Sequence, residues 1–236
     1  MKPKAIITLT RFRDLFTKLA NSVDKFEPDT VRRIAVVDAP LAVSIKVGNW
    51  EFIPGVQPFV FARNANIGIR AAGPDTDVLL INDDCELVMP VTDRLQKIAD
   101  QKSIEPIGIL SPQVDGGIGN MLQRVGTPNA CPSWYVSKER LAFVCVWLPA
   151  ITRAKIGELD EDFTGYGGDD RDYCLRAQEA GLLLAVTPTV IVRHSRAGSA
   201  SFLRLIGDRT RCQQMSDMDK LVIEKAAARS AAKEPK

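Results

Sequence analysis

Short apolar runs alternate with amphipathic stretches through the first half of the chain. The runs carry few polar residues, which is typical of strands that are covered on both faces. The stretches between them repeat apolar residues every three or four positions, which predicts helices. The pattern predicts strands over residues 4–9, 33–38, 77–82 and 107–110, a further strand over 58–62, and helices over 13–25, 64–72 and 91–102. Such alternation indicates βαβ units, and so an α/β fold with a mostly parallel sheet flanked by helices.

The second half has a less regular pattern. Residues 111–137 are rich in Gly, Pro, Asn and Gln, which predicts loops, with an irregular hairpin as the alternative. After them we expect strands over 141–148, 182–186 and 190–194, and helices over 170–180 and 217–232. We therefore expect one domain over 1–203, with two halves at about 1–110 and 111–203. A helical extension follows over 204–236.

Composition fits an ordinary globular protein. The chain has 236 residues, 45% of them hydrophobic, and a net charge of +2. Both ends are basic and the middle is acidic, which solvated surfaces explain without a nucleic-acid or membrane partner. Five cysteines without C-x-x-C spacing argue against a disulfide framework. No signal peptide and no membrane-spanning run is recognised, so the expected location is the cytoplasm.

A single histidine, His194, narrows the metal chemistry. A zinc site built from several histidines is excluded, so any metal must be held mainly by carboxylates. Carboxylate ligands favour a hard cation such as Mn²⁺ or Mg²⁺. A lone histidine is also compatible with a purely structural role, and that alternative stays open at this point.

Two acidic clusters are candidates for chemistry. Asn82-Asp83-Asp84 ends a predicted buried strand, where ligands of parallel sheets bind. Asp169-Asp170 begins a predicted helix after a glycine-rich segment, and an ionised carboxylate there could act as a general base. In both clusters the alternative is helix or turn capping combined with solvation.

Four segments resemble the GT-A fold glycosyltransferases, in particular the inverting family 2. In chain order they are IAVVDAP, ARNANIGIRAAGPDTDVLLINDDCEL, GELDEDFTGYGGDDRDYCLRAQEAG and VTPTVIVRHSRAGS. Together they cover roughly residues 4–202. The resemblance implies a GT-A (Rossmann-like) fold with a mixed, mostly parallel sheet and a C-terminal helical extension. It also implies that the half at about 1–110 binds the donor and the half at about 111–203 binds the acceptor.

The resemblance also implies roles for individual residues. Asp170 matches the catalytic base, and Asp84 and His194 match the metal ligands for Mn²⁺ or Mg²⁺. The donor is expected to contact Thr10, Asp38, Arg63, Asn66, Asn82, Asp83, Arg196 and Ser199. The acceptor side is expected to include Trp134, Trp147 and Asp169. Asn82 stands where the family's D-x-D motif has its first Asp, and Asp169 stands where the family has Glu.

The implied activity is metal-dependent, inverting transfer of a sugar from a nucleotide-diphosphate sugar, preferably a UDP-sugar, to an acceptor hydroxyl. The expected partners are the nucleotide-sugar donor and an acceptor glycan. Three alternatives remain open from the sequence. They are a modified base in DNA as the acceptor, a non-catalytic nucleotide-sugar-binding protein, and a nucleotidyltransferase.

Overall fold

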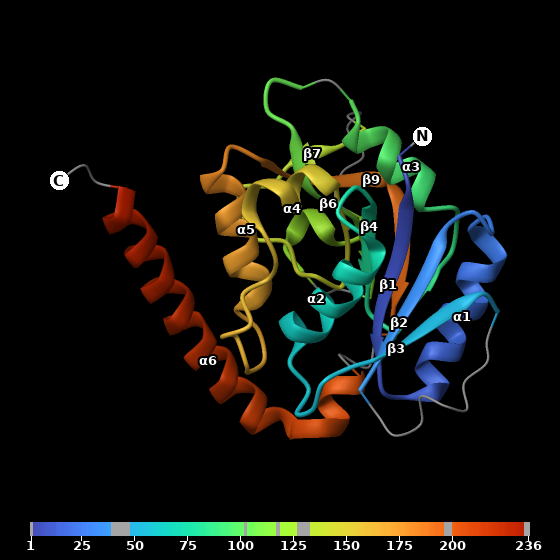
Figure 1. Ribbon diagram of the computed structural model, residues 1–236, viewed down its shortest axis with the longest axis horizontal. Coiled ribbons are helices and arrows are strands. Elements are labelled where there is room, and N and C mark those ends of the chain that lie inside the picture. The colour runs from blue at the N-terminus through green and yellow to red at the C-terminus, as the bar shows by residue number, and fades with distance from the viewer. Residues whose placement is uncertain are drawn as a thin grey trace.

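The computed structural model describes residues 2–38, 48–101, 103–116, 119–126, 133–195 and 200–233. Within them, nine strands form a single mixed sheet, shown in Figure 1. The strand order is β3-β2-β1-β4-β8-β6-β9-β5, and β7 pairs with β9. This confirms the predicted α/β fold class, with a mixed sheet flanked by helices.

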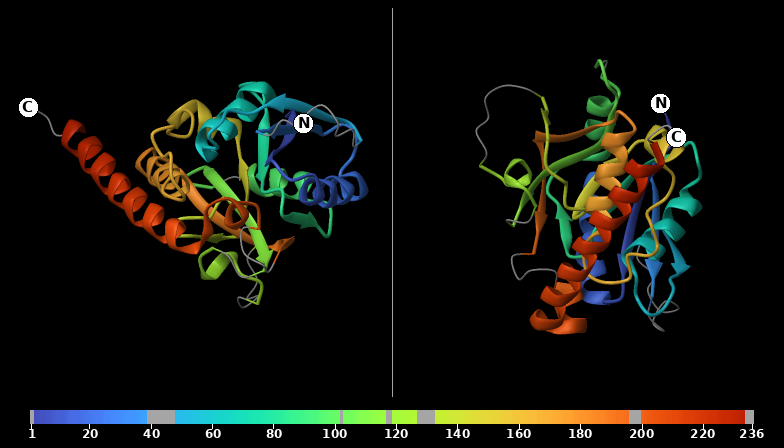
Figure 2. Two further views of the ribbon diagram at one scale, coloured as in Figure 1. Left: turned by 90° about the horizontal axis from the view of Figure 1, so that it is seen from below. Right: turned by 90° about the vertical axis from the view of Figure 1, so that its left-hand side faces the viewer.

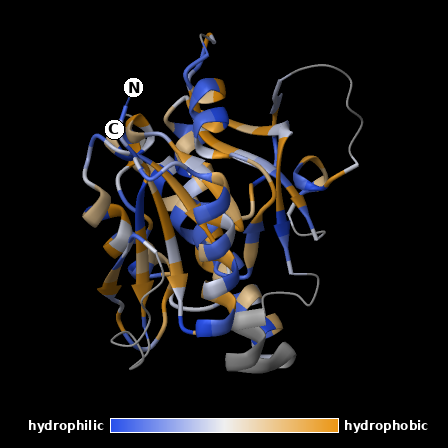
Figure 3. Cartoon of the chain, turned by 90° about the vertical axis from the view of Figure 1, so that its right-hand side faces the viewer, coloured by the Kyte–Doolittle hydropathy of each residue, from blue (hydrophilic) through white to orange (hydrophobic). Residues whose placement is uncertain are grey.

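The first four strands in this order form the parallel part of the sheet. They are β3 (Trp50–Pro54), β2 (Arg32–Val37), β1 (Lys4–Thr10) and β4 (Asp77–Ile81). All five residues of β4 are buried, as expected for a strand with helices on both sides. Figure 3 shows hydrophobic residues gathered along these strands.

The remaining strands mix both directions. They are β5 (Cys85–Leu87), β6 (Ile107–Asp115), β7 (Tyr135–Val136), β8 (Cys145–Leu148) and β9 (Leu183–His194). β8 is antiparallel to both β4 and β6, whereas β6 and β9 are parallel. β5 and β7 are each antiparallel to β9. The first acidic cluster follows β4 and His194 ends β9, so both lie at strand ends of the same sheet.

Two hydrophobic cores cover the two faces of the sheet. Helices α1 (Arg13–Phe26) and α3 (Thr92–Ala99) bury residues such as Phe16 and Leu95 in one core. Helices α2 (Phe61–Ala72) and α5 (Asp169–Glu179) bury residues such as Ile69 and Tyr173 in the other. Two short helices complete this part, α4 (Ala150–Ile156) and the 3-10 turn η2 (Met121–Gln123). Figure 2 shows the sheet between these two helical layers.

The last element is the long helix α6 (Ala200–Lys233), which runs beside α5 (Figure 1). The sequence predicted only its Ala-rich second half, and the expected border at 203/204 falls in its first turn. No helix in the described ranges combines the length and the apolar character needed to cross a membrane.

Several predicted elements are wrong in their bounds. Residues 58–62 are not a strand but lead into α2, and the edge strand lies earlier, at β3. Only the second half of 141–148 is a strand, and α4 was not predicted. The two predicted extended segments at 182–186 and 190–194 are one strand, β9, with an irregular register against β6 between Thr187 and Ile191.

Candidate active site

The two acidic clusters meet at one cavity of about 480 Å³. Asn82 and Asp83 reach it from the loop after β4, and Asp169 and Asp170 reach it from the first turn of α5. Arg211 of α6 also lines it. The two clusters are more than eighty positions apart in sequence, and the sheet brings them together. This shared cavity is the candidate active site.

A second cavity of about 390 Å³ adjoins the first through Asp83, which lines both. Asp84 and His194 line this second cavity. Asp83 is buried, and its Oδ2 accepts a hydrogen bond of 2.8 Å from the Thr10 hydroxyl. Thr10 therefore fixes the carboxylate that lines both the first cavity and the second, which holds the Asp84–His194 pair.

Asp84 and His194 form a compact pair that fits a divalent metal ion. His194 Nε2 lies 3.2 Å from Asp84 Oδ1, and both side chains are almost fully buried. The two positions are adjacent because Cys85 of β5 lies directly opposite His194 of β9. Within the described residues, neither ring nitrogen of His194 makes a hydrogen bond. A buried imidazole next to a carboxylate is a suitable pair of metal ligands.

The Cys85 sulfur lies within 4.8 Å of the same ligand atoms. Burial, and secondly the Asp84 charge, raise the pKa of this thiol well above its ordinary value. The thiol instead donates to the Val144 carbonyl, at 3.7 Å. The donor set is therefore one carboxylate and one imidazole, which suits Mn²⁺ or Mg²⁺ when phosphate oxygens complete the coordination.

Asp169 and Asp170 occupy the first turn of α5, and neither is its N-cap. Gly168 holds the cap position with φ of +89°, a conformation that favours glycine. Burial raises the pKa of Asp169 to about 7, and the neighbouring Asp170 charge adds to this rise. Asp169 is therefore not fully ionised at neutral pH, contrary to the expectation for an exposed cap residue.

Asp170 remains partly accessible, with 19% of its side chain exposed. Burial raises its pKa, and the Arg140 guanidinium, whose Nη1 lies 3.9 Å from Asp170 Oδ1, opposes that rise. A carboxylate with a raised pKa is a stronger base than a solvated one. Asp170 therefore combines access to the cavity with increased basicity.

A further cluster of polar residues lies where β1 and β2 end. Asp38 is buried and accepts two hydrogen bonds from Arg11, at 3.2 Å from Nε and 2.8 Å from Nη2. Asn64 shapes the loop after β3 by accepting from the Val56 amide at 2.7 Å. The Asn64 side chain and Asp38 both border Gly55, where a Cβ would lie 2.9 Å from Asn64 Oδ1. Arg11 and Asn64 were missed from sequence, although both adjoin predicted site residues.

Four predicted site residues lie elsewhere. Asn66 is buried and holds residue Leu159, donating to its carbonyl at 2.9 Å and accepting from its amide at 3.0 Å. Arg63 forms an ion pair with Glu161, and Trp134 donates to Gln101. Trp147 has no exposed surface and belongs to the core. None of the four lines either cavity.

Two further predicted donor residues, Arg196 and Ser199, lie outside the described residues. Several residues that line the first cavity were not predicted from the sequence, among them Arg140, Tyr166 and Arg211. Arg140 and Tyr166 come from irregular segments, and Arg211 comes from the extension that was expected to lie outside the domain. The basic end of the chain was the one signal that pointed to Arg211.

No protein family model and no curated protein matches this sequence. Solved structures do match its fold. GalNAc-T7 with UDP, GalNAc and Mn²⁺ matches 82% of the chain, with a TM-score of 0.68 and 13% identity. TarS from S. aureus matches 82% of it, with a TM-score of 0.60 and 14% identity. The catalytic domain of Drosophila β1,4-galactosyltransferase 7, in complex with xylobiose, matches 80%, with a TM-score of 0.51 and 14% identity.

The chain has the fold of the GT-A glycosyltransferases. This confirms the family resemblance at the level of the fold. The chain spans 44% of GalNAc-T7 and 36% of TarS, so it matches less than half of either protein. In this GT-A fold, the loop after β4 and the start of α5 lie at one cavity.

Proposed function

We propose that this protein is a metal-dependent, inverting glycosyltransferase that uses a nucleotide-diphosphate sugar, with a UDP-sugar as the first candidate. The observation that carries the proposal is the cavity shared by Asp83 and Asp170, with the Asp84–His194 pair directly adjacent. GalNAc-T7 was solved with UDP, which supports a uridine nucleotide as the donor. The galactosyltransferase was solved with xylobiose, which supports a glycan as the acceptor.

Asp84 and His194 would hold a divalent cation, Mn²⁺ or Mg²⁺. Such a cation, when bound, neutralises the negative charge that develops on the leaving diphosphate. Thr10 keeps the Asp83 carboxylate in place beside it. Asp38, held by Arg11, is the candidate contact for the nucleoside. Asn82 lines the catalytic cavity and is the candidate contact for the donor sugar.

Asp170 would accept the proton of the acceptor hydroxyl as that oxygen attacks the sugar carbon. A single in-line displacement of the diphosphate inverts the configuration at that carbon. The Arg140 guanidinium opposes the rise in the pKa of Asp170 that burial causes, and the raised pKa increases the basicity of this carboxylate. Asp169, with a pKa of about 7, would lie beside it as a partly protonated neighbour.

An acceptor of glycan type fits the similar structures better than DNA, because none of their names mentions a nucleic acid. A non-catalytic nucleotide-sugar-binding protein would not need a basic carboxylate at the cavity wall. A nucleotidyltransferase would release pyrophosphate, whereas sugar transfer releases a nucleoside diphosphate.

The test begins with thermal unfolding in a panel of nucleoside diphosphates and their sugars, with and without Mn²⁺. A ligand that binds only the folded state raises the unfolding temperature. We expect UDP with Mn²⁺ to stabilise the wild type and to lose that effect in Asp84→Ala. Release of the diphosphate from the responding sugar nucleotide is then measured.

Asp170→Asn separates catalysis from binding. We expect this variant to keep the stabilisation by UDP and Mn²⁺ while diphosphate release falls by ~10³-fold or more, in line with loss of a general base and its oriented charge. Asp75→Asn, at an exposed aspartate that lines neither cavity, is the matched control. Wild-type turnover in Asp170→Asn would refute the assignment of the base.

A further inference from the structure

Helix α6 is built onto the catalytic cavity through the glycine-rich segment before α5. A Cβ at Gly165 would lie 3.2 Å from Met218 Cγ, and one at Gly168 would lie 2.8 Å from Met218 Cβ. The Tyr166 amide donates to Gln214 Oε1 at 3.0 Å. The glycines of this segment therefore allow α6 to approach the backbone, and α6 forms one wall of the cavity.

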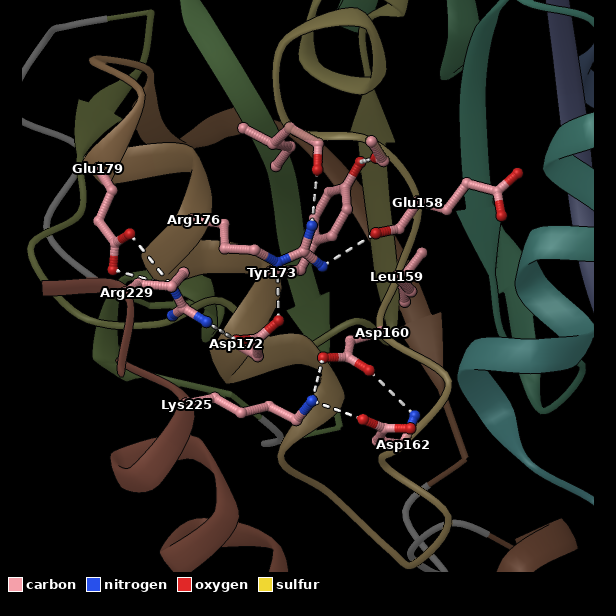
Figure 4. A network of polar contacts seen from close by, with 12 residues as sticks. Glu158, Leu159, Asp160, Asp162, Asp172, Tyr173, Arg176, Glu179, Lys225 and Arg229 are labelled. Carbon is pink, nitrogen blue, oxygen red and sulfur yellow. Dashed lines mark hydrogen bonds and ion pairs between the residues drawn. The ribbon is translucent and has the colours of Figure 1, made fainter. Parts of the chain in front are cut away.

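Ion pairs hold the rest of α6 against α5 and the loop before it (Figure 4). Lys225 lies 2.7 Å from carboxylate oxygens of both Asp160 and Asp162. Arg229 lies 2.8 Å from the buried carboxylate of Asp172, two positions after the catalytic candidate. These contacts fix the second half of the helix, which follows the residues that α6 presents to the cavity.

Arg211 and Met215 are the α6 residues that line the cavity. The Arg211 guanidinium lies over the Tyr166 ring, at 4.8 Å from its centre. Among the residues whose side chains the structure describes, which leaves out 200–209 of α6, no carboxylate is within ion-pair distance of Arg211. Stacking on tyrosine fixes the plane of a guanidinium while leaving its N–H groups available for hydrogen bonds.

The other arginine of the cavity is already engaged. Arg140 Nη1 lies 3.9 Å from Asp170 Oδ1 and 3.9 Å from Asp219 Oδ1. Asp219 in turn pairs with Arg171 at 2.9 Å. Arg211 is therefore the cationic group of this wall, within the described ranges, that is not matched by protein carboxylates. Its planar donor fork suits a phosphate or carboxylate group.

We propose that Arg211 binds an anionic group carried by the acceptor, so that the acceptor alcohol is a phosphate- or carboxylate-bearing molecule. Tyr166 orients the guanidinium, and Met215 supplies apolar contact beside it. The assignment of this site to the acceptor rests on the proposed function, because Asp170 on the same cavity is the base for the acceptor hydroxyl. In the proposed function the donor diphosphate is bound at the adjoining second cavity, through the cation held by the Asp84–His194 pair.

The experiment titrates three small alcohols, glycerol 3-phosphate, glycerate and glycerol, against the full chain with and without UDP and Mn²⁺. Binding is followed by ligand-observed NMR. We expect at least one of the two anionic probes to bind about tenfold tighter than glycerol, as one charge-assisted contact provides. Which of the two binds better distinguishes phosphate from carboxylate.

Arg211→Gln is expected to remove the preference for the anionic probes and to leave binding of UDP with Mn²⁺ unchanged. Arg211→Lys should restore part of the preference, because it keeps the charge without the planar fork. Lys220→Gln, which removes one exposed positive charge from the same helix, is the matched control and should behave as wild type.

Equal binding of all three probes by the wild type would overturn the proposal. So would loss of UDP affinity in Arg211→Gln, which would assign this arginine to the donor. If UDP fails to bind the wild type while Arg211-dependent anion binding persists, the anion site stands and the proposed function fails.

Discussion

Asp169→Asn is expected to stabilise the protein at alkaline pH and to leave its stability at acidic pH almost unchanged. Asp169 is 8% exposed and lies next to Asp170. Its pKa rises from the ordinary 3.8 to about 7 in the folded protein. The folded state therefore holds this proton more tightly than the unfolded chain does. That contribution to stability is complete below about pH 4 and is lost as the pH rises to about 7.

The size of the effect follows from the difference between the two pKa values. Each pKa unit corresponds to ~1.4 kcal/mol, so the full difference is ~4 kcal/mol above pH 7. Asp170 shares the site, and part of the cost disappears if one proton is shared by the pair. We therefore expect Asp169→Asn to raise the free energy of unfolding by about 2–4 kcal/mol at pH 8. In a chain of this size that is a rise in Tm on the order of 5–10 °C.

The assay is thermal and urea unfolding of wild type and variant at pH 4.5 and pH 8. Asn resembles the protonated Asp169 in shape and charge, so the difference in unfolding free energy between the two proteins should shrink to ~1 kcal/mol at pH 4.5. Asp75→Asn, at an exposed position, controls for the loss of a negative charge and should show no pH-dependent gain. If Asp169→Asn is less stable than wild type at pH 8, burial does not raise this pKa and the reasoning is wrong.

Four further substitutions test other contacts. Asn66→Ala should lower the free energy of unfolding in urea by about 2–3 kcal/mol, because it removes buried hydrogen bonds. It should leave UDP affinity unchanged, and a large loss of UDP affinity would instead indicate that Asn66 contacts the donor. Asp172→Asn should cost about 3 kcal/mol, because it leaves Arg176 and Arg229 without a buried partner, whereas Arg229→Gln should cost less than half of that. Glu27→Gln should destabilise by about 1–3 kcal/mol in the same assay, because Glu27 accepts hydrogen bonds from both backbone amides at the start of α3.

The parallel part of the sheet could be predicted because its strands are short, apolar and separated by amphipathic helices. β4 and α1 agree with their sequence patterns to within one residue at either end. The edge strand β3 was missed because Trp50–Pro54 alternates weakly and is only half buried. Helix α6 was predicted too short because residues 207–217 carry few apolar side chains, and contacts with α5 and its preceding loop supply the order that the pattern does not.

The two acidic clusters could be identified from local sequence, since each pairs carboxylates with a strand end or a helix start. Their environment could not, because burial and neighbouring charges depend on the tertiary structure. The sequence does not distinguish Asp169 from Asp170, yet Asp169 is buried and Asp170 is partly exposed. Asn66 and Asn64 are two positions apart on α2, and only the structure tells which borders Asp38. Arg211 could be identified as a cavity residue only from the structure, because its position depends on the fold and on the close approach of α6 to the glycine-rich segment.

The pairing of β5 with β9 has a consequence for how this protein could change over evolution. Cys85 faces His194 in a ladder of only three residue pairs, and Ser195 donates back to the Asp84 carbonyl at 3.0 Å. Inserting or deleting one residue within β9 would rotate the imidazole to the opposite side of the sheet. The segment between the irregular register at Thr187 and His194 is therefore far less tolerant of length changes than its position near the sheet edge would indicate.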